Sequence, residues 1–115
     1  MRRTLFALVM MTGAAEAQVP VTAGPGVIPC AEFAEYYRKN PSLAEVQSFA
    51  WAQGYWSAVN EAVRARGEQT RDLRVIPNPT KKQFLRSFCD KRPLASYIDA
   101  VRELYLTFPE NPRSP

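Results

Sequence analysis

Residues 42–66 read SLAEVQSFAWAQGYWSAVNEAVRAR, a stretch without proline whose apolar residues recur at the three- and four-residue spacing of an α-helix. These residues cover about half of the helix circumference, and they are Phe49, Trp51, Ala52, Tyr55, Trp56, Ala58, Val59, Ala62 and Val63. Ser42 and Glu45 have the spacing of a capping box, and Gly67 is placed to end the helix at its C′ position. We therefore expect a central helix with neighbours on more than one side.

The same stretch holds the residues that we consider for a partner-binding surface. They combine two aromatic rings with part of the polar stripe opposite the apolar face, and they are Trp51, Gln53, Tyr55, Asn60 and Arg64. Core packing is the alternative for the rings, since a small domain short of aliphatic residues fills its interior with aromatic ones. For Asn60 the alternatives are a hydrogen bond to a buried backbone group or simple exposure to water.

Gly54 is the only glycine within a predicted helix. Glycine costs about 1 kcal/mol relative to alanine at such a position. The sequence therefore predicts a structural role, in which another helix or an aromatic ring packs closely against Gly54.

Prolines divide the rest of the chain into three further helical segments. One runs over residues 30–39, one starts at Thr80 with a second capping-box spacing to Gln83, and one starts near Pro93. Apolar side chains of the last segment fall within a narrow arc, and they are Leu94, Tyr97, Ile98, Val101, Leu104, Tyr105 and Phe108. Outside the leader, no stretch alternates convincingly as a strand would. We predict an all-α fold, a small orthogonal bundle of about four helices.

The first residues have the features of a signal peptide. Arg2 and Arg3 precede a short apolar run, and Ala15-Glu16-Ala17 fits the cleavage rule of small residues flanking any residue. The run is far shorter than the roughly 20 residues that span a bilayer. We expect residues 1–17 to be a signal peptide, 18–29 a flexible leader, 30–108 the helical domain and 109–115 a proline-rich tail, with no membrane span.

Two cysteines, Cys30 and Cys89, are present. In an oxidising compartment an even number of cysteines indicates a disulfide, here between the first and third helices. Redox-active thiols are the alternative, but such sites usually have the close C-x-x-C spacing that is missing here.

The chain contains no histidine. This excludes the usual general base near neutral pH and the serine–histidine and cysteine–histidine nucleophiles. With both cysteines paired, nitrogen and sulfur ligands for zinc are also lost. We expect no catalytic residue, no metal and no cofactor.

Charge gives little indication of a nucleic-acid partner. Without residues 1–17 the chain has 13 basic and 10 acidic residues. Basic residues cluster in the second half, where they could meet an acidic protein or an anionic lipid; they include Arg64, Arg66, Arg71, Arg74, Lys81, Lys82, Arg86, Lys91 and Arg92. Interleaved acidic residues favour a solvated mixed surface instead.

A signal peptide is followed by Cys30-Ala-Glu-Phe33, then by Phe49 to Asn60 with its Gly54-Tyr55-Trp56, and then by Phe88-Cys89-Asp-Lys-Arg-Pro93-Leu94. This layout resembles two groups of small periplasmic helical proteins over about residues 30–109. They are the HdeA-type acid-stress chaperones and the immunity proteins that neutralise amidases delivered by type VI secretion. The resemblance implies an orthogonal helical bundle with a Cys30–Cys89 bridge and implies no catalytic residue. The second helix here is longer and more aromatic than in the chaperones.

Three functions follow as hypotheses. The first is a non-enzymatic periplasmic protein that binds another protein as an inhibitor or immunity partner, with a homodimer as a further possibility. The second is an acid-activated chaperone, because protonation of the 10 mature carboxylates would leave a side-chain charge of +13 and strong self-repulsion. The third is a cryptic hydrolase that works from carboxylates, tyrosine or lysine alone.

Overall fold

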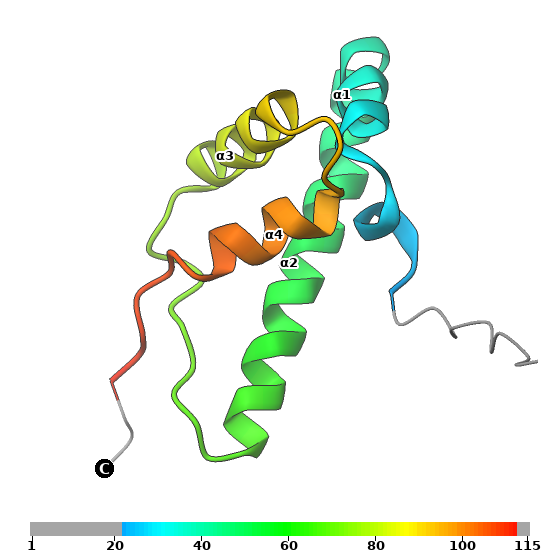
Figure 1. The fold of residues 1–115 in the computed structure, drawn as a ribbon. Helices are drawn as coiled ribbons and strands as arrows, with labels where there is room; N and C mark the ends of the chain where they lie inside the picture. The colour runs from blue at the N-terminus through cyan, green and yellow to red at the C-terminus, as the bar shows by residue number, and fades with distance from the viewer. Residues whose placement is uncertain (1–21, 113–115) are drawn as a thin grey trace, which may run out of the picture.

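The computed structural model describes residues 22–112, and four α-helices account for most of them. A short 3₁₀-helix precedes them (Figure 1), and the elements are η1 (Gly24–Val27), α1 (Cys30–Lys39), α2 (Pro41–Ala65), α3 (Asn78–Lys91) and α4 (Tyr97–Tyr105). These residues contain no β-strand, so the predicted all-α, four-helix fold is confirmed. The predicted signal peptide lies outside the described residues.

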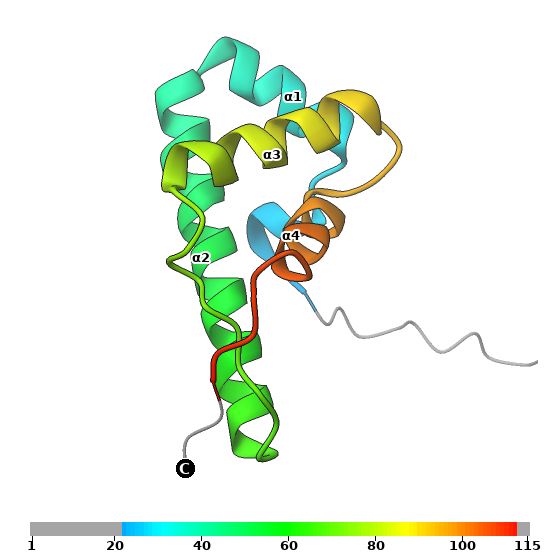
Figure 2. The ribbon, with the colours of Figure 1, turned by 90° about the vertical axis from the view of Figure 1, so that its left-hand side faces the viewer.

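The long helix α2 is the axis on which the other elements assemble. Helix α4 runs roughly perpendicular to α2 and packs on it (Figure 1), whereas α3 extends away from α2 and packs mainly on α1 and α4 (Figure 2). The second half of α2 is flanked instead by the connector, residues 66–77, and by the C-terminal segment. Gly67 ends α2 with a φ of +71°, and its N–H bonds the Arg64 carbonyl while Glu68 bonds that of Val63. The predicted C′ role of Gly67 is confirmed.

Both predicted capping boxes are wrong. Helices α2 and α3 begin before Ser42 and Thr80, at Pro41 and Asn78, with a proline in the first turn of each. The N-terminal capping box of the described residues is instead Ser96–Asp99 at the start of α4, where Asp99 Oδ2 accepts a hydrogen bond from the Ser96 N–H at 2.9 Å.

The fourth helix starts at Tyr97, later than the start predicted near Pro93. The turn that precedes it, residues 93–95, accepts hydrogen bonds from the start of α1. The Ala95 and Pro93 carbonyls accept hydrogen bonds from the N–H groups of Cys30 and Ala31 at 2.7 and 3.1 Å. These are donors that the first turn of a helix leaves unsatisfied. Because residues 93–95 are a turn, Leu94 is fully exposed and does not belong to the buried arc.

The core is formed mainly by aromatic and alanine side chains of α2 and α4. Trp56 is 1% exposed and donates its indole N–H to the Val101 carbonyl at 2.9 Å. Tyr97 is also 1% exposed and donates its hydroxyl to the Ser48 carbonyl at 2.8 Å. Each buried ring thus has a partner for its polar atom, as burial requires.

Within the predicted flexible leader, residues 18–29, the described part includes η1, which packs against α2 and α4. The Trp51 indole donates to the Ala23 carbonyl at 3.0 Å, and η1 lies on the face of that ring. A Cβ added to Gly26 would lie 2.2 Å from Trp51 Cη2, so only glycine allows this approach. The Ile28 carbonyl accepts a hydrogen bond from the Tyr97 N–H at 2.9 Å.

The start of the predicted proline-rich tail pairs with the connector. The Asp72 N–H bonds the Pro109 carbonyl, and the Asn111 N–H bonds the Thr70 carbonyl, both at 2.8 Å. This antiparallel pairing extends the folded unit beyond Phe108. It also places the connector along α2.

A disulfide joins Cys30, in the first turn of α1, to Cys89, in the last turn of α3. Both cysteines are fully buried, and their Cα atoms are 4.6 Å apart. The predicted bridge between the first and third helices is confirmed.

Replacing both cysteines by alanine should lower the free energy of unfolding by about 4 kcal/mol, because the bridge closes a loop between residues 59 positions apart. Urea denaturation of the variant and of the oxidised wild type measures this difference. Equal stability of the two proteins would contradict the structural role of the bridge.

Candidate functional site

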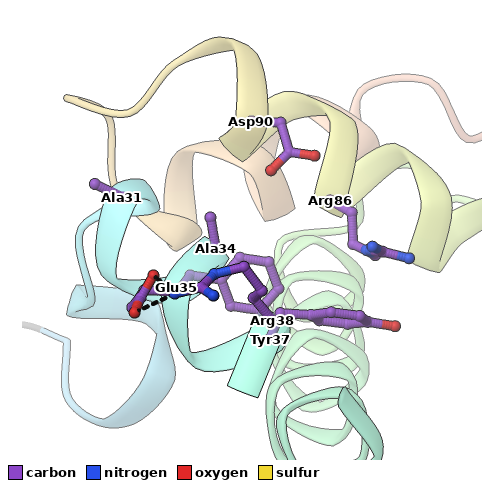
Figure 3. Close-up of a pocket in the computed structure, with 8 residues that line it drawn as sticks. Ala31, Ala34, Glu35, Tyr37, Arg38, Arg86 and Asp90 are labelled. Atoms are coloured by element: carbon purple, nitrogen blue, oxygen red, sulfur yellow. Dashed lines mark hydrogen bonds and ion pairs between the residues drawn. The ribbon is translucent and has the colours of Figure 1, made fainter. Parts of the chain in front are cut away.

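A groove lies between α1 and α3, beside the disulfide (Figure 3). Its volume is about 350 Å³, and the residues that line it are Ala31, Phe33, Ala34, Glu35, Tyr37, Arg38, Arg86 and Asp90. We call this the α1–α3 groove.

The helical spacing of small and charged residues produces the groove. Ala31 and Ala34 present little side chain toward α3 where the two helices approach each other. Glu35 and Arg38 follow on α1, while Arg86 and Asp90 are one turn apart on α3. Charged groups of both signs therefore border a floor of small and aromatic residues.

Tyr37 is the aromatic wall of the groove and connects three helices. The Arg86 guanidinium carbon lies 4.0 Å from the centre of its ring. The Tyr37 hydroxyl donates to Glu45 on α2, which also accepts a hydrogen bond from Lys82 on α3 at 2.8 Å. The hydrogen bonds from Lys82 and then Tyr37 hold the pKa of the Glu45 carboxyl below its ordinary value of 4.5.

The charges of the groove differ in what they already contact. Arg38 forms an ion pair with Glu35 at 2.6 Å, and hydrogen bonds from Arg38 and then Lys39 lower the pKa of Glu35. Arg86 and Asp90 are exposed and form no ion pair within residues 22–112. Their guanidinium and carboxylate groups are thus available to an oppositely charged partner.

The residues predicted as a partner surface do not lie together. Trp51 and Tyr55 stack with ring centres 5.6 Å apart, but η1 covers Trp51, and Tyr55 contacts Arg102 through its hydroxyl. Gln53 is exposed beside a second cavity. Arg64 is exposed near the end of α2 and is paired with Glu61.

Asn60 has a structural role instead of a free surface position. Its amide nitrogen donates to the Arg71 carbonyl at 2.9 Å, and its oxygen accepts from the Arg71 N–H at 3.0 Å. The same oxygen accepts from the Tyr105 hydroxyl at 2.9 Å. Of the alternatives considered for Asn60, the hydrogen bond to the backbone is the one observed.

The close packing predicted at Gly54 is wrong. Gly54 is exposed, and no atom lies within 4 Å of the position that a Cβ would take. The glycine that an aromatic ring does approach is Gly26.

Sequence reasoning missed the α1–α3 groove because its residues come from two helices far apart in the chain. Their spacing, Glu35 with Arg38 and Arg86 with Asp90, is readable, but it resembles an ordinary solvated helix face. The usable indication was the cysteine pair, since Cys30 and Cys89 place these two faces next to each other.

Residues 22–112 contain no cluster of three or more histidine, cysteine, aspartate or glutamate side chains arranged to hold a metal ion. Within that part of the chain, no helix combines the length and apolar character of a membrane span. Comparisons with protein families, with curated proteins and with solved structures found no match to this chain.

Gly54→Ala should raise the free energy of unfolding by about 1 kcal/mol, because alanine is the better helix former and its Cβ meets nothing. The matched control is Gly26→Ala, which should lower stability because its Cβ would overlap the Trp51 ring. Urea denaturation compares the three proteins. A destabilised Gly54→Ala variant would restore the packing role.

Proposed function

We propose that this chain is an exported, non-enzymatic protein that binds another protein through the α1–α3 groove. The observation that carries the proposal is the position of Arg86 and Asp90, exposed and outside any ion pair of the described residues, at a groove fixed by a disulfide. A concave surface that is already held in place loses little conformational entropy when a partner binds to it.

The chemistry of the groove specifies its partner. A segment that fits would place a carboxylate against Arg86 and a lysine or arginine against Asp90, with an apolar side chain between them over Ala34. Paired charges of opposite sign fix the orientation of a bound segment and disfavour wrong partners.

Other features support export and the absence of catalysis. The pattern of residues 1–17 is that of a signal peptide, and a buried disulfide suits an oxidising compartment such as the periplasm. The chain has no histidine, and both of its cysteines are bonded. The more specific role, inhibitor or immunity partner, rests on the resemblance to the immunity proteins.

An acid-activated chaperone is the second candidate, and Glu45 favours it. This carboxylate receives hydrogen bonds from both α1 and α3, so its protonation would weaken the contacts among three helices. Because its pKa in the folded state is lowered, its contribution to stability is present above pH 4.5 and is lost as the pH falls through the folded pKa.

The proposed binding predicts the effect of reversing the charges of the groove. Arg86→Glu should weaken partner binding at least about tenfold, because repulsion replaces attraction, and Asp90→Lys should do the same. Arg64→Glu on the far part of α2 and Glu103→Lys on α4 are exposed controls with the same changes of charge, and both should bind normally.

A photo-crosslinking residue at Ala34, expressed in the periplasm, should capture the partner, whereas one at exposed Ala58 should not. The captured protein is then purified, and its affinity for each charge variant is measured. Equal capture at both positions, or unchanged affinity of Arg86→Glu, would contradict binding at the groove.

The chaperone hypothesis predicts how the stability of the protein changes at low pH. The wild type should lose stability below pH 4.5, and Glu45→Gln should lose less over that range while being less stable near neutral pH. Circular dichroism across this range and an aggregation assay with an acid-sensitive client are the measurements. Unchanged tertiary signal and no protection of the client at about pH 2 would exclude the chaperone.

A further inference from the structure

A second cavity, of about 350 Å³, lies on the other side of α3, between α2 and the connector. Leu73, Ile76 and Pro77 supply apolar surface above the buried Trp56. The polar groups of the lining come from Gln53, Ser57, Arg74, Asn78 and Lys81. None of these residues lines the α1–α3 groove. We call it the Lys81 cavity.

Lys81 is an unusual residue for the wall of a cavity because it is buried, with 5% of its surface exposed. It occupies the buried stripe of α3, one turn before Leu85 and two turns before Cys89. The sequence places it in a basic cluster with a solvated surface as the default, and for Lys81 that default is wrong. Lysine is almost never fully buried unless it is paired.

The groups in direct contact with the Lys81 ammonium are uncharged, and the nearby Asp72 carboxylate lies beyond ion-pair distance. Its Nζ donates to the Leu73 carbonyl and, at 3.3 Å, to Asn78 Oδ1. It lies 5.9 Å from the centre of the Trp56 ring and 5.6 Å from that of Phe108. No carboxylate of the described residues reaches ion-pair distance from it.

These contacts leave one N–H donor of the Lys81 ammonium without a protein acceptor. An ammonium has three N–H donors, and two are used by protein acceptors. Carbonyl and ring contacts compensate part of the desolvation but supply no counter-charge. Burial lowers the pKa of Lys81, with Asp72 opposing this effect more weakly. A bound anion would satisfy both the third donor and the charge.

We propose that the Lys81 cavity binds a carboxylate, with its acidic end on the Lys81 ammonium and an apolar body against Leu73 and Ile76, above the Trp56 ring. Lys81 is the buried cation of the cavity, and the exposed Arg74 adds a second positive charge to its lining, so the cavity favours an anion. The apolar walls of Leu73 and Ile76 suit a hydrocarbon body, and the volume is that of a small-ligand pocket. A free organic acid and the C-terminus of a peptide share this chemistry.

The test is an NMR titration of the mature oxidised protein that follows the indole N–H signals, with Trp51→Phe identifying that of Trp56. The probes are 3-phenylpropionate, its uncharged amide, and a short peptide ending in phenylalanine with a free or an amidated C-terminus. We expect 3-phenylpropionate to shift the Trp56 signal with a Kd on the order of 1 mM. The amide should cause no shift.

Lys81→Met should weaken binding at least about tenfold, whereas Lys91→Met, at the exposed end of α3, should leave it unchanged. If Lys81→Met does not fold, the pKa of the Lys81 amine is measured in the wild type with and without 3-phenylpropionate. A bound carboxylate must raise this pKa, because it stabilises the charged amine. Binding of the peptide with a free C-terminus, but not of the amidated peptide, would identify a peptide C-terminus as the source of the carboxylate. Binding of 3-phenylpropionate without binding of either peptide would identify a small organic acid. No shift with any probe, equal binding of the amide, or an unchanged pKa would overturn the proposal.

Discussion

The bond between Cys30 and Cys89 joins the first turn of α1 to the last turn of α3, so helices from opposite halves of the chain share one buried contact. Helix α1 is short and largely polar, with only Cys30 and Phe33 buried. Apolar burial of this size would hold it weakly on α2. The bridge supplies the remainder, and the turn at residues 93–95 adds hydrogen bonds at the same end of α1. The α1–α3 groove exists because this end of both helices is fixed.

The second half of the molecule is held by hydrogen bonds instead of a covalent bond. Asn60 binds both backbone groups of Arg71 and the hydroxyl of Tyr105, which fixes the connector on α2. The Arg71 side chain then donates to the carbonyls of Leu106 and Phe108. Helix, connector and C-terminal segment are joined through one pair of residues, and the Lys81 cavity lies along this connector.

Local patterns predicted the helices well and their surroundings poorly. Residues 30–39 and the end of α2 at Gly67 follow from periodicity and glycine geometry, which depend on neighbouring residues alone. The capping boxes failed because α2 and α3 begin earlier than Ser42 and Thr80, with a proline in the first turn of each. Glu45 contacts Tyr37 and Lys82 instead, and Gln83 contacts Ser87. Gly54 failed for another reason: a glycine in a helix indicates that close packing is allowed, but not that a neighbour is present. The groove needed the pairing of two distant helices, for which the cysteines were the single clue.

Helix α3 shows why its charges must be assigned one by one. Its buried stripe consists of Lys81, Leu85 and Cys89, and its mostly polar remainder carries Arg86 and Asp90 toward the groove. Five residues along a helix change direction by about 140°, so Lys81 and Arg86 face different cavities although they belong to one basic cluster of the sequence. Arg86 is exposed and stacks on the Tyr37 ring, whereas the buried Lys81 contacts a backbone carbonyl, Asn78 Oδ1 and two ring faces. Two positive charges five positions apart therefore have different surroundings, and the roles proposed for Arg86 and Lys81 rest on this difference.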